Sequence, residues 1–367
     1  MKYPTADIKI YNNIPLGKQW LNKYKGIKPI FTCTLGFTAT GLIEGISAAG
    51  ATPQSRRFTA LADAEFLVNG VSDNPKFPLP PLDVGVSPTV ISRAVIEKFN
   101  LPVYVFNAGL PYQPSVSTID LQGSVAQCVT TGKALPLNVV NHLFEQGLWW
   151  GNKLARENPS SYLILSECVV GGTTTALAVL TALGIEAKGK VNSSHPVCNH
   201  QQKWQVVKEG LKNAGLSCHS SPLEIVGAVG DPMQIFVAGL GLSASVSMGV
   251  MLAGGTQMLA VFALMKGLQK HCDFASDLSN VVVGTTRWVA LDNTGDTVNL
   301  AKMVGDVPLC ATELNFSGSI YPSLQSYEQG FVKEGVGAGG SAIASHLLQL
   351  TPLELMVAIE TIISRFP

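Results

Sequence analysis

The chain has 367 residues, of which 46% are apolar and 14% charged, and its 25 basic side chains balance 25 acidic ones. With no basic excess to neutralise a phosphate backbone, binding to DNA or RNA is not expected. The high apolar fraction predicts a large buried core and makes oligomerisation an expectation.

The location of the protein is predicted from its first residues, its cysteines and one uncharged stretch. No positive segment followed by an apolar run opens the chain, so no signal peptide is expected. Seven scattered cysteines fit a reducing compartment better than a disulfide framework. Residues 232–265 carry no charge, but the break at Gly254 to Gln257 favours a buried helix, strand and second helix over a membrane span. We therefore predict a cytoplasmic protein without membrane contact.

The first half of the chain predicts strands that end in small residues. Residues 1–28 form an arm with a short helix over 16–24, and residues 28–36 form a buried strand. A loop of small residues follows over 38–50, and residues 60–70 are interpreted as a helix turning into a strand. A helix begins near Pro88, and a strand over 102–109 ends in Asn107-Ala-Gly.

The second half repeats this alternation. A helix is predicted over 135–157, with Gly147 and Gly151 indicating close helix packing, and it leads to a strand over 162–168. Another helix is predicted over 201–214, and further strands over 225–231, 250–253 and 280–284. The alternation predicts a Rossmann-like α/β fold, a parallel sheet with helices on both faces. Ligands bind such sheets at the carboxyl ends of the strands. This places the following residues on one rim: Gly36, Asn107, Glu167, Asp231, Gly254 and Thr285.

The segment Tyr162 to Leu180 predicts an anion site on this rim. An apolar strand ends at Glu167, Gly171 and Gly172 form a corner, and a helix follows. Free N–H groups at a helix start, together with threonine hydroxyls at 173–175, suit a phosphate. The alternative is that the glycines and threonines only begin a helix.

A second glycine-rich segment adjoins a carboxylate near the carboxyl terminus. Glu334 stands directly before Gly-Val-Gly-Ala-Gly-Gly, where little steric hindrance separates it from a ligand. This arrangement suits a general base, although a glutamate at the start of a loop is the simpler interpretation.

Other familiar motifs are missing or weak. The sequence has no Gly-x-x-x-x-Gly-Lys-Ser/Thr, and no Gly-x-Gly-x-x-Gly follows the first strand. His195, Cys198 and His200, with Cys218 and His219, match no regular zinc spacing. Cys168 beside the turn is interpreted as a small buried thiol rather than a nucleophile.

Together these segments resemble the nicotinate-nucleotide:dimethylbenzimidazole phosphoribosyltransferase family, and more closely its divergent archaeal and cyanobacterial branch. The family's Gly-Glu-Met-Gly-Ile-Gly-Asn-Thr-Thr resembles Ser166-Glu-Cys-Val-Val-Gly-Gly-Thr-Thr, and its Gly-Glu-Gly-Thr-Gly-Ala resembles Lys333-Glu-Gly-Val-Gly-Ala. The resemblance covers residues 85–350. Val169 and Gly172 depart from the family's phosphate turn, where a glycine and an asparagine stand.

The resemblance implies a transferase that moves the phosphoribosyl group of nicotinate mononucleotide to a benzimidazole or purine base, for the nucleotide loop of cobamides. Glu334 would be the base, and Glu167 would stabilise the ribose cation or hold the ribose hydroxyls. The resemblance implies no metal or other cofactor, and a homodimer as the assembly. The implied phosphate and ribose contacts are Gly171, Gly172, Thr173, Thr174, Lys203, Gly230, Asp231, Gly254, Gly335 and Gly337.

The domain division and the choice between functions are expectations that the sequence does not settle. Residues 29–330 are expected to form the transferase domain, while 1–28 and 331–367 form a small helical subdomain that contributes the Glu334 loop. The alternatives for function are a nucleotide-binding regulatory protein of the same fold that no longer catalyses the reaction, and a transferase that uses another phosphorylated donor.

Overall fold

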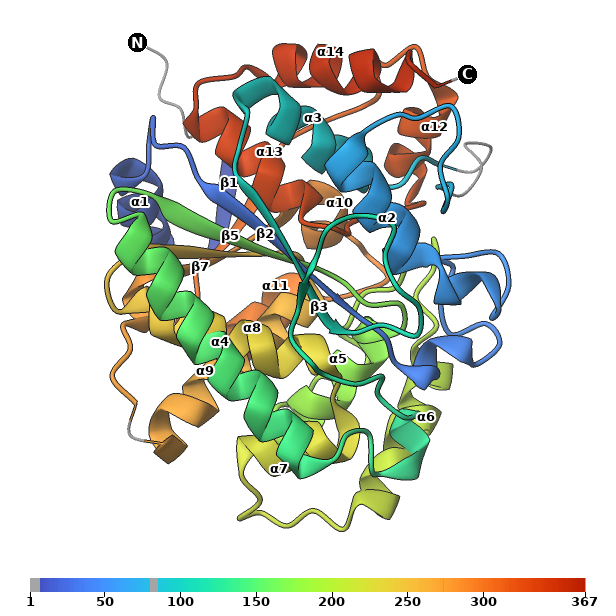
Figure 1. Ribbon diagram of the computed structural model, residues 1–367, viewed down its shortest axis with the longest axis vertical. Coiled ribbons are helices and arrows are strands. Elements are labelled where there is room, and N and C mark those ends of the chain that lie inside the picture. Colours follow the sequence, from blue (N-terminus) through green and yellow to red (C-terminus); the bar gives the residue numbers. More distant parts are fainter. Residues whose placement is uncertain (1–6, 80–84, 273, 367) are drawn as a thin grey trace.

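The computed structural model describes residues 7–79, 85–272 and 274–366, and it centres on one eight-stranded sheet (Figure 1). The strand order is β1-β8-β7-β6-β5-β2-β3-β4. Within the described residues, β1 is antiparallel to β8 and every other neighbouring pair is parallel. The strands are β1 (Ile8–Asn12), β2 (Ile30–Gly36), β3 (Val103–Gly109), β4 (Ile119–Asp120), β5 (Tyr162–Cys168), β6 (Gly249–Ala253), β7 (Val281–Thr286) and β8 (Leu309–Thr312).

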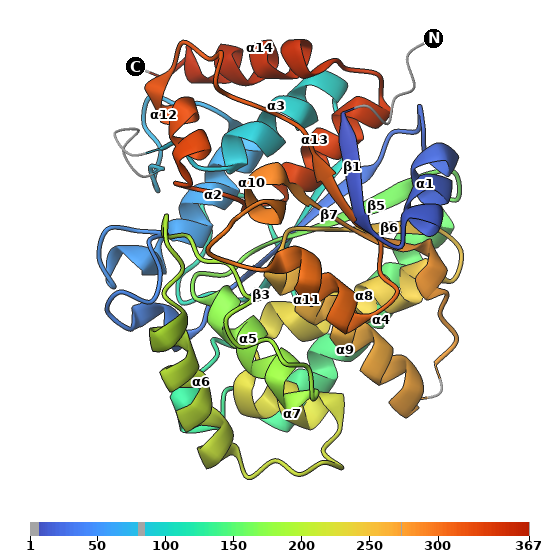
Figure 2. The same ribbon diagram turned by 180° about the vertical axis from the view of Figure 1, so that it is seen from behind.

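Helices cover both faces of the sheet, as predicted, and the fold is α/β. In Figure 1, one layer lies above the sheet and a larger one below it, and Figure 2 shows the same two layers from behind. The upper layer holds α2 (Thr59–Asn69), α3 (Thr89–Phe99), α10 (Arg287–Ala290), α12 (Pro322–Gln325), α13 (Ala338–Leu347) and α14 (Pro352–Ile363). The lower layer holds α4 (Leu137–Glu157), α5 (Gly172–Ala182), α6 (His200–Ala214), α7 (Pro222–Val229), α8 (Pro232–Ser245), α9 (Thr256–Cys272) and α11 (Thr297–Val304), while α1 (Ile14–Lys23) packs beside β1.

Strand β5 shows why the apolar runs form a two-sided core. Successive side chains of a strand point to opposite faces. Leu163 and Leu165 therefore enter the lower core, whereas Tyr162 and Ile164 enter the upper one. All four side chains are at most 1% exposed, which explains why the strand forms an unbroken apolar run in the sequence.

The sheet has a topological switch point between β2 and β5. From β2 the chain continues to β3 and β4 on one side, whereas from β5 it continues to β6, β7 and β8 on the other. Loops that leave neighbouring strands in opposite directions open a crevice at their carboxyl ends, where ligands of such sheets bind. Glu167 lies at this end of β5.

Close packing of α4 on α8 confirms the prediction made from Gly147 and Gly151. A methyl group added at Gly147 would lie 2.3 Å from the carbonyl oxygen of Phe236, and one at Gly151 would lie 2.3 Å from that of Leu240. The uncharged stretch forms α8, β6 and α9, as predicted. In the described part of the chain, no helix is both long and apolar enough to cross a membrane.

Two predicted elements are wrong. Residues 225–231 were expected to form a strand, but they belong to helix α7 and the turn after it. The helix begins with a capping box, in which Ser221 accepts a hydrogen bond from the backbone of Glu224, and Pro222 occupies the first turn. A short apolar run alone does not distinguish a strand from a buried helix. Residues 60–70 are also helical almost throughout, as α2.

The predicted division into a main domain and a subdomain from the chain ends stays a prediction. The structure places residues 8–12 in the main sheet as β1, paired with β8. At the other end of the chain, α13 packs on β6 and β7.

Candidate active site

Glu334 is held at the carboxyl end of β7 by four donors. Its Oε2 accepts hydrogen bonds from the backbone N–H of Thr286 (3.0 Å) and the hydroxyl of Thr285 (3.1 Å). Its Oε1 accepts from the backbone N–H of Gly339 (3.0 Å) and of Gly335 (3.2 Å). Because Gly339 belongs to the first turn of α13, the carboxylate also lies at the positive end of that helix.

In these surroundings the carboxyl group of Glu334 has a pKa near neutral pH. Burial raises its pKa to about 7, against the opposing effect of the four hydrogen bonds. The residue is only partly buried, so part of it remains accessible. A carboxylate with these properties can accept a proton from a bound ligand at neutral pH.

Glu167 is the second carboxyl group of the rim, and it is buried, with 6% of its surface exposed. Its Oε2 accepts from the backbone N–H of Val169 (2.9 Å), and its Oε1 accepts from the side-chain amide of Gln257 (2.9 Å). Burial raises its pKa to about 8, with smaller contributions from the negative charges of Asp231 and Glu334. Burial therefore favours the protonated form of Glu167, and a cation placed beside it would favour the carboxylate.

The two glutamate motifs meet in space although they lie far apart in the sequence. The backbone N–H of Val336 donates to the carbonyl oxygen of Glu167 (3.2 Å). Gly337 has a φ of 72° and packs so tightly that an added methyl group would lie 2.6 Å from the Cβ of Ser166. The structure thus brings Glu167 and Glu334 to the same rim, next to the switch point.

The Gly171–Gly172 turn starts α5 as predicted, but its glycines are packed against protein. A methyl group at Gly171, whose φ is 87°, would lie 2.8 Å from the backbone nitrogen of Gly41. One at Gly172 would lie 1.8 Å from the side-chain oxygen of Gln257. Within the described residues, the buried hydroxyl of Thr174 has no hydrogen-bond partner. Thr173 is partly exposed at the same helix start.

Asp231 reaches the site from the start of α8 and not from the end of a strand. Its Oδ1 accepts from the backbone N–H of Gln234 (3.2 Å), which caps α8, and its Oδ2 accepts from the hydroxyl of Thr175 (2.5 Å). The side chain is fully buried, and burial raises its pKa to about 6. Asp231 therefore ties α8 to α5, and Gly230 precedes it as the last residue of the turn.

Gly254 and Gly335 adopt backbone conformations that favour glycine. Gly254, directly after β6, has a φ of 159°, and its N–H donates to the carbonyl oxygen of Gly284 (2.9 Å). Gly335 has a φ of 157°, which turns the chain from Glu334 toward α13. The structure supplies backbone reasons for both glycines, and their roles in binding a ligand stay predictions.

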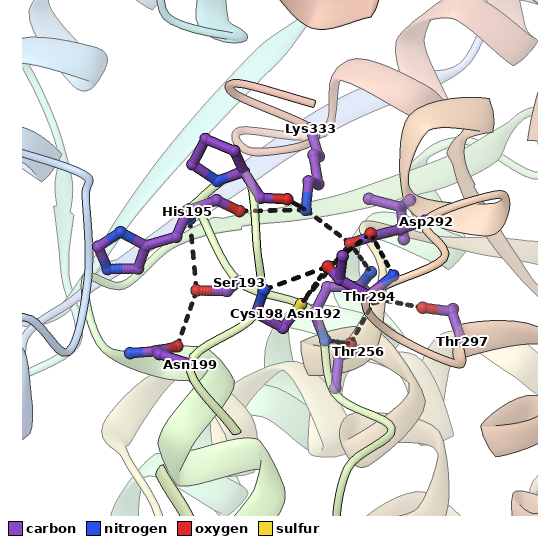
Figure 3. Close-up of polar contacts among 12 residues, drawn as sticks. Asn192, Ser193, His195, Cys198, Asn199, Thr256, Asp292, Thr294, Thr297 and Lys333 are labelled. Carbon is purple, nitrogen blue, oxygen red and sulfur yellow. Dashed lines mark hydrogen bonds and ion pairs between the residues drawn. The ribbon is translucent and has the colours of Figure 1, made fainter. Parts of the chain in front are cut away.

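Lys203 and Lys333 direct their ammonium groups toward the loop 192–199, and Figure 3 shows the contacts of Lys333. Lys333, directly before Glu334, forms a buried ion pair with Asp292 (2.6 Å), and its ammonium group also donates to the carbonyl oxygens of His195 (3.1 Å) and Pro196 (3.3 Å). Lys203 lies on α6 and donates to the carbonyl oxygen of Asn192 (2.5 Å). Burial lowers the pKa of Lys203 to about 7.

The cysteines near the rim have structural contacts. Cys168 is buried, and its thiol donates to Asp63 (3.3 Å), which also accepts from the hydroxyls of Ser87 and Thr89. Burial raises the pKa of Cys168 well above its usual value, so the group is a thiol and not a thiolate. Cys198 contacts Thr294 and Asp292.

Sequence reasoning missed several residues that build the rim. Gln257 was visible only as part of the break in the uncharged stretch, and Lys333 only as the residue before the glutamate. Asp292 lies in an Asp-Asn-Thr-Gly turn that resembles any loop. Arg56 had no signal beyond its charge, because it is buried through contacts with the backbone of the preceding loop 41–50.

Comparisons with known proteins place the chain in a family. No family model matches it. It is 60% identical over 359 residues to a UPF0284 protein of Gloeothece citriformis, covering 98% of this chain and 97% of the relative. A UPF0284 protein of Trichodesmium erythraeum is 58% identical over 363 residues, with 98% and 99% covered. The chain belongs to the UPF0284 family.

The fold of this UPF0284 chain is that of a solved phosphoribosyltransferase. It matches CobT from Thermus thermophilus with a TM-score of 0.57 and 16% identity, covering 91% of this chain and 84% of that one. A second structure, titled nicotinate-nucleotide-dimethylbenzimidazole phosphoribosyltransferase from the same organism, gives a TM-score of 0.56. The resemblance drawn from the two glutamate motifs is confirmed in fold, and the cyanobacterial relatives fit a divergent branch.

Proposed function

We propose that this UPF0284 chain transfers the phosphoribosyl group of nicotinate mononucleotide to a benzimidazole or purine base. The products are nicotinate and an α-riboside 5′-phosphate for the nucleotide loop of cobamides. The observation that carries the proposal is the Glu334 carboxyl group, held by four donors at the carboxyl end of β7, on the same rim of the sheet as Glu167.

In this reaction Glu334 takes the proton from one ring nitrogen of the incoming base while the other ring nitrogen attacks C1′ of the ribose. The bond from C1′ to nicotinate breaks, and its electron pair neutralises the pyridinium ring, so the leaving group needs no proton. Attack from the face opposite nicotinate inverts C1′ from β to α. A positioned base contributes about 10²–10⁴-fold to the rate of such a step.

Glu167 is proposed to stabilise the positive charge that develops on the ribose. Its raised pKa falls when a cationic substrate binds beside it, so the carboxylate forms when it is needed. Asp231, which raises the pKa of Glu167, adds negative potential from the start of α8. The 5′-phosphate is proposed to lie between the start of α5, with Thr173 and Thr174, and Lys203 on α6.

The test is to incubate the purified protein with nicotinate mononucleotide and either dimethylbenzimidazole or adenine, and to measure free nicotinate and α-riboside phosphate. Formation of both products in equal amounts is the expected result. Binding of the mononucleotide without release of nicotinate would favour the non-catalytic regulatory protein. Other phosphorylated donors in the same assay test the remaining alternative. We also propose a homodimer, which light scattering after size exclusion tests.

A further inference from the structure

Gln257 reaches Glu167 from the start of the neighbouring helix. It is the second residue of α9, which follows β6 after the turn at Gly254. Because β6 pairs with β5, the start of α9 lies beside the carboxyl end of β5, which carries Glu167. The side-chain Nε2 of Gln257 donates to Oε1 of Glu167 (2.9 Å). Thr256 fixes this start of α9, because its hydroxyl donates to the side-chain oxygen of Asn192 (3.1 Å) and accepts from the backbone N–H of the same residue (3.1 Å).

The amide oxygen of Gln257 is held without a hydrogen bond. Among the described residues, this Oε1 is buried and has no partner. A buried polar atom without a partner is energetically unfavourable, so a glutamine that only filled space here would be less favourable than an apolar side chain of the same length. The contact of Nε2 with Glu167 therefore accounts better for a glutamine at this position than packing does.

The same amide explains the glycine at position 172. Gly172 is the first residue of α5, and its φ lies outside the left-handed region, so its backbone does not require glycine. What excludes a side chain there is Gln257. Outside the segment around Gly172, the three atoms nearest to an added methyl group all belong to Gln257: Oε1 at 1.8 Å, Cδ at 2.5 Å and Nε2 at 2.9 Å. The side chain of Gln257 thus fills the volume that a larger residue at 172 would need.

The motif that this turn resembles has an asparagine where the chain has Gly172. Asparagine carries the same functional group as Gln257, a primary amide. The Nε2 of Gln257 lies 2.9 Å from the Cβ that a side chain at 172 would have, and the amide nitrogen of an asparagine lies only slightly closer to its own Cβ. An amide carried by the turn would therefore donate to Glu167 from almost the same place.

We propose that Gln257 is the positioning residue of Glu167, and that it supplies from α9 the amide that the resembling motif carries in the turn. Its Nε2 fixes the orientation of the Glu167 carboxyl group and favours the carboxylate, because a hydrogen bond to a charged acceptor is stronger than one to a neutral acceptor. Without Gln257, the backbone N–H of Val169 is the remaining donor to Glu167 among the described residues. The importance of the contact for turnover rests on the proposed function, whereas the contact itself and the exchange of positions do not.

The first experiment measures the ionisation of Glu167 by NMR titration of protein with isotope-labelled glutamate, in which Glu167→Gln assigns the resonance. Gln257→Met keeps the length of the side chain and removes the donor. The acid ionisation constant of Glu167 should therefore fall about tenfold, which means that its pKa should rise. Asp231 and Glu334, whose negative charges also raise the pKa of Glu167, are the same in both proteins. An unchanged titration midpoint in Gln257→Met would overturn the proposal.

The matched control is Gln269→Met on the same helix. The amide of Gln269 donates to the backbone carbonyl oxygen of Ser276 (3.0 Å) and is equally a partly buried glutamine. Its loss should leave the titration of Glu167 unchanged, and circular dichroism confirms that both variants are folded. An equal shift in Gln257→Met and Gln269→Met would show a general effect on α9 and overturn the assignment of Gln257.

The second experiment moves the amide between the two positions. Gly172→Asn alone should destabilise the fold, because its Cβ would overlap the oxygen of Gln257. Combined with Gln257→Ala, it should unfold at a higher denaturant concentration than Gly172→Asn alone, and it should recover most of the ionisation constant of Glu167 that Gln257→Ala loses. Gly172→Asn with Gln269→Ala is the control, in which no recovery is expected. Additive losses in the first double variant would contradict the exchange.

The third experiment connects the contact with turnover. At about pH 7, kcat/KM of Gln257→Met should be about tenfold below that of wild type, and the difference should shrink toward about pH 9, where Glu167 ionises without this hydrogen bond. The ionisation of Glu334 affects both proteins alike. A Gln257→Met protein with a raised pKa at Glu167 and an unchanged kcat/KM at both pH values would remove Gln257 from the reaction. If wild type itself forms no α-riboside phosphate, the proposed function fails, and the titration and the exchange alone decide the role of Gln257.

Discussion

In the segment 334–340, glycines bring N–H groups to a carboxylate, whereas in the turn 169–172 they make room for other parts of the protein. Gly335 and Gly339 donate to Glu334, and Gly337 lets this segment rest on Ser166. Gly171 and Gly172 instead accommodate Gly41 and the side chain of Gln257. Two glycine-rich motifs that look equivalent in a sequence thus have different structural roles, and one of them directly supplies hydrogen bonds to a carboxyl group.

Replacing Glu334 by Gln should have the largest effect on activity. The substitution keeps the size of the side chain and removes the base, so kcat should fall by about 10²–10⁴-fold. Binding of nicotinate mononucleotide, measured by calorimetry, should change little, because the base acts on the acceptor. Retained turnover in Glu334→Gln would remove this residue from the reaction.

Replacing Gly171 by Ala should mainly reduce stability. The substitution combines an unfavourable left-handed backbone, about 1–2 kcal/mol, with overpacking against Gly41, typically another 1–3 kcal/mol. Denaturant unfolding monitored by circular dichroism measures the change.

Gly184→Ala is the matched control for that substitution. Gly184 has a φ of 83°, and a methyl group there would meet no atom within 4 Å, so only the backbone cost applies. Equal losses of stability at the two positions would show that contact with Gly41 contributes nothing to the role of the turn.

A further expected effect is the pH dependence of stability in the protein without substrate. Burial raises the pKa of Glu167 to about 8 and that of Glu334 to about 7, so the folded state binds protons that the unfolded state has released. The stability contributed by these groups is present below about pH 4.5, the ordinary pKa of a glutamate, and is lost as pH rises toward 8.

Melting temperatures between about pH 5 and about pH 7 should therefore decline, and Glu167→Gln should flatten that decline. Over the same range, kcat/KM should rise with an apparent pKa near 7, because the base acts as the carboxylate. A melting temperature that rises with pH in wild type, but not in Glu167→Gln, would contradict the expected loss of stability as Glu167 ionises.

Local signals in the sequence predicted the centre of the sheet and the two glutamates. Strands such as β5 are buried on both faces and end in small residues, so the strand and its carboxyl end can both be identified from the sequence. Residues 225–231 are as apolar as a strand, and only the capping box at Ser221 identifies the helix. Strands β1 and β8 were missed because they are short and are defined by pairing with distant segments, β1 with β8 and β8 with both β1 and β7.

The parts of the site that were not predicted depend on contacts between distant segments. Gln257 matters because it reaches Glu167, and Lys333 because it meets Asp292. Arg56 lies in a surface-like sequence, Ser-Arg-Arg, and is buried only because the loop 41–50 folds over it. None of these partners follows from spacing along the chain.

The antiparallel edge of the sheet has a consequence for how the protein folds during synthesis. Strand β1 leaves the ribosome almost 300 residues before its partner β8, which begins at Leu309. Until then β1 has no sheet neighbour, and such distant pairings slow folding. The Glu334 segment emerges later still, so the sheet edge and the rim that carries Glu334 are completed only after both segments have been synthesised.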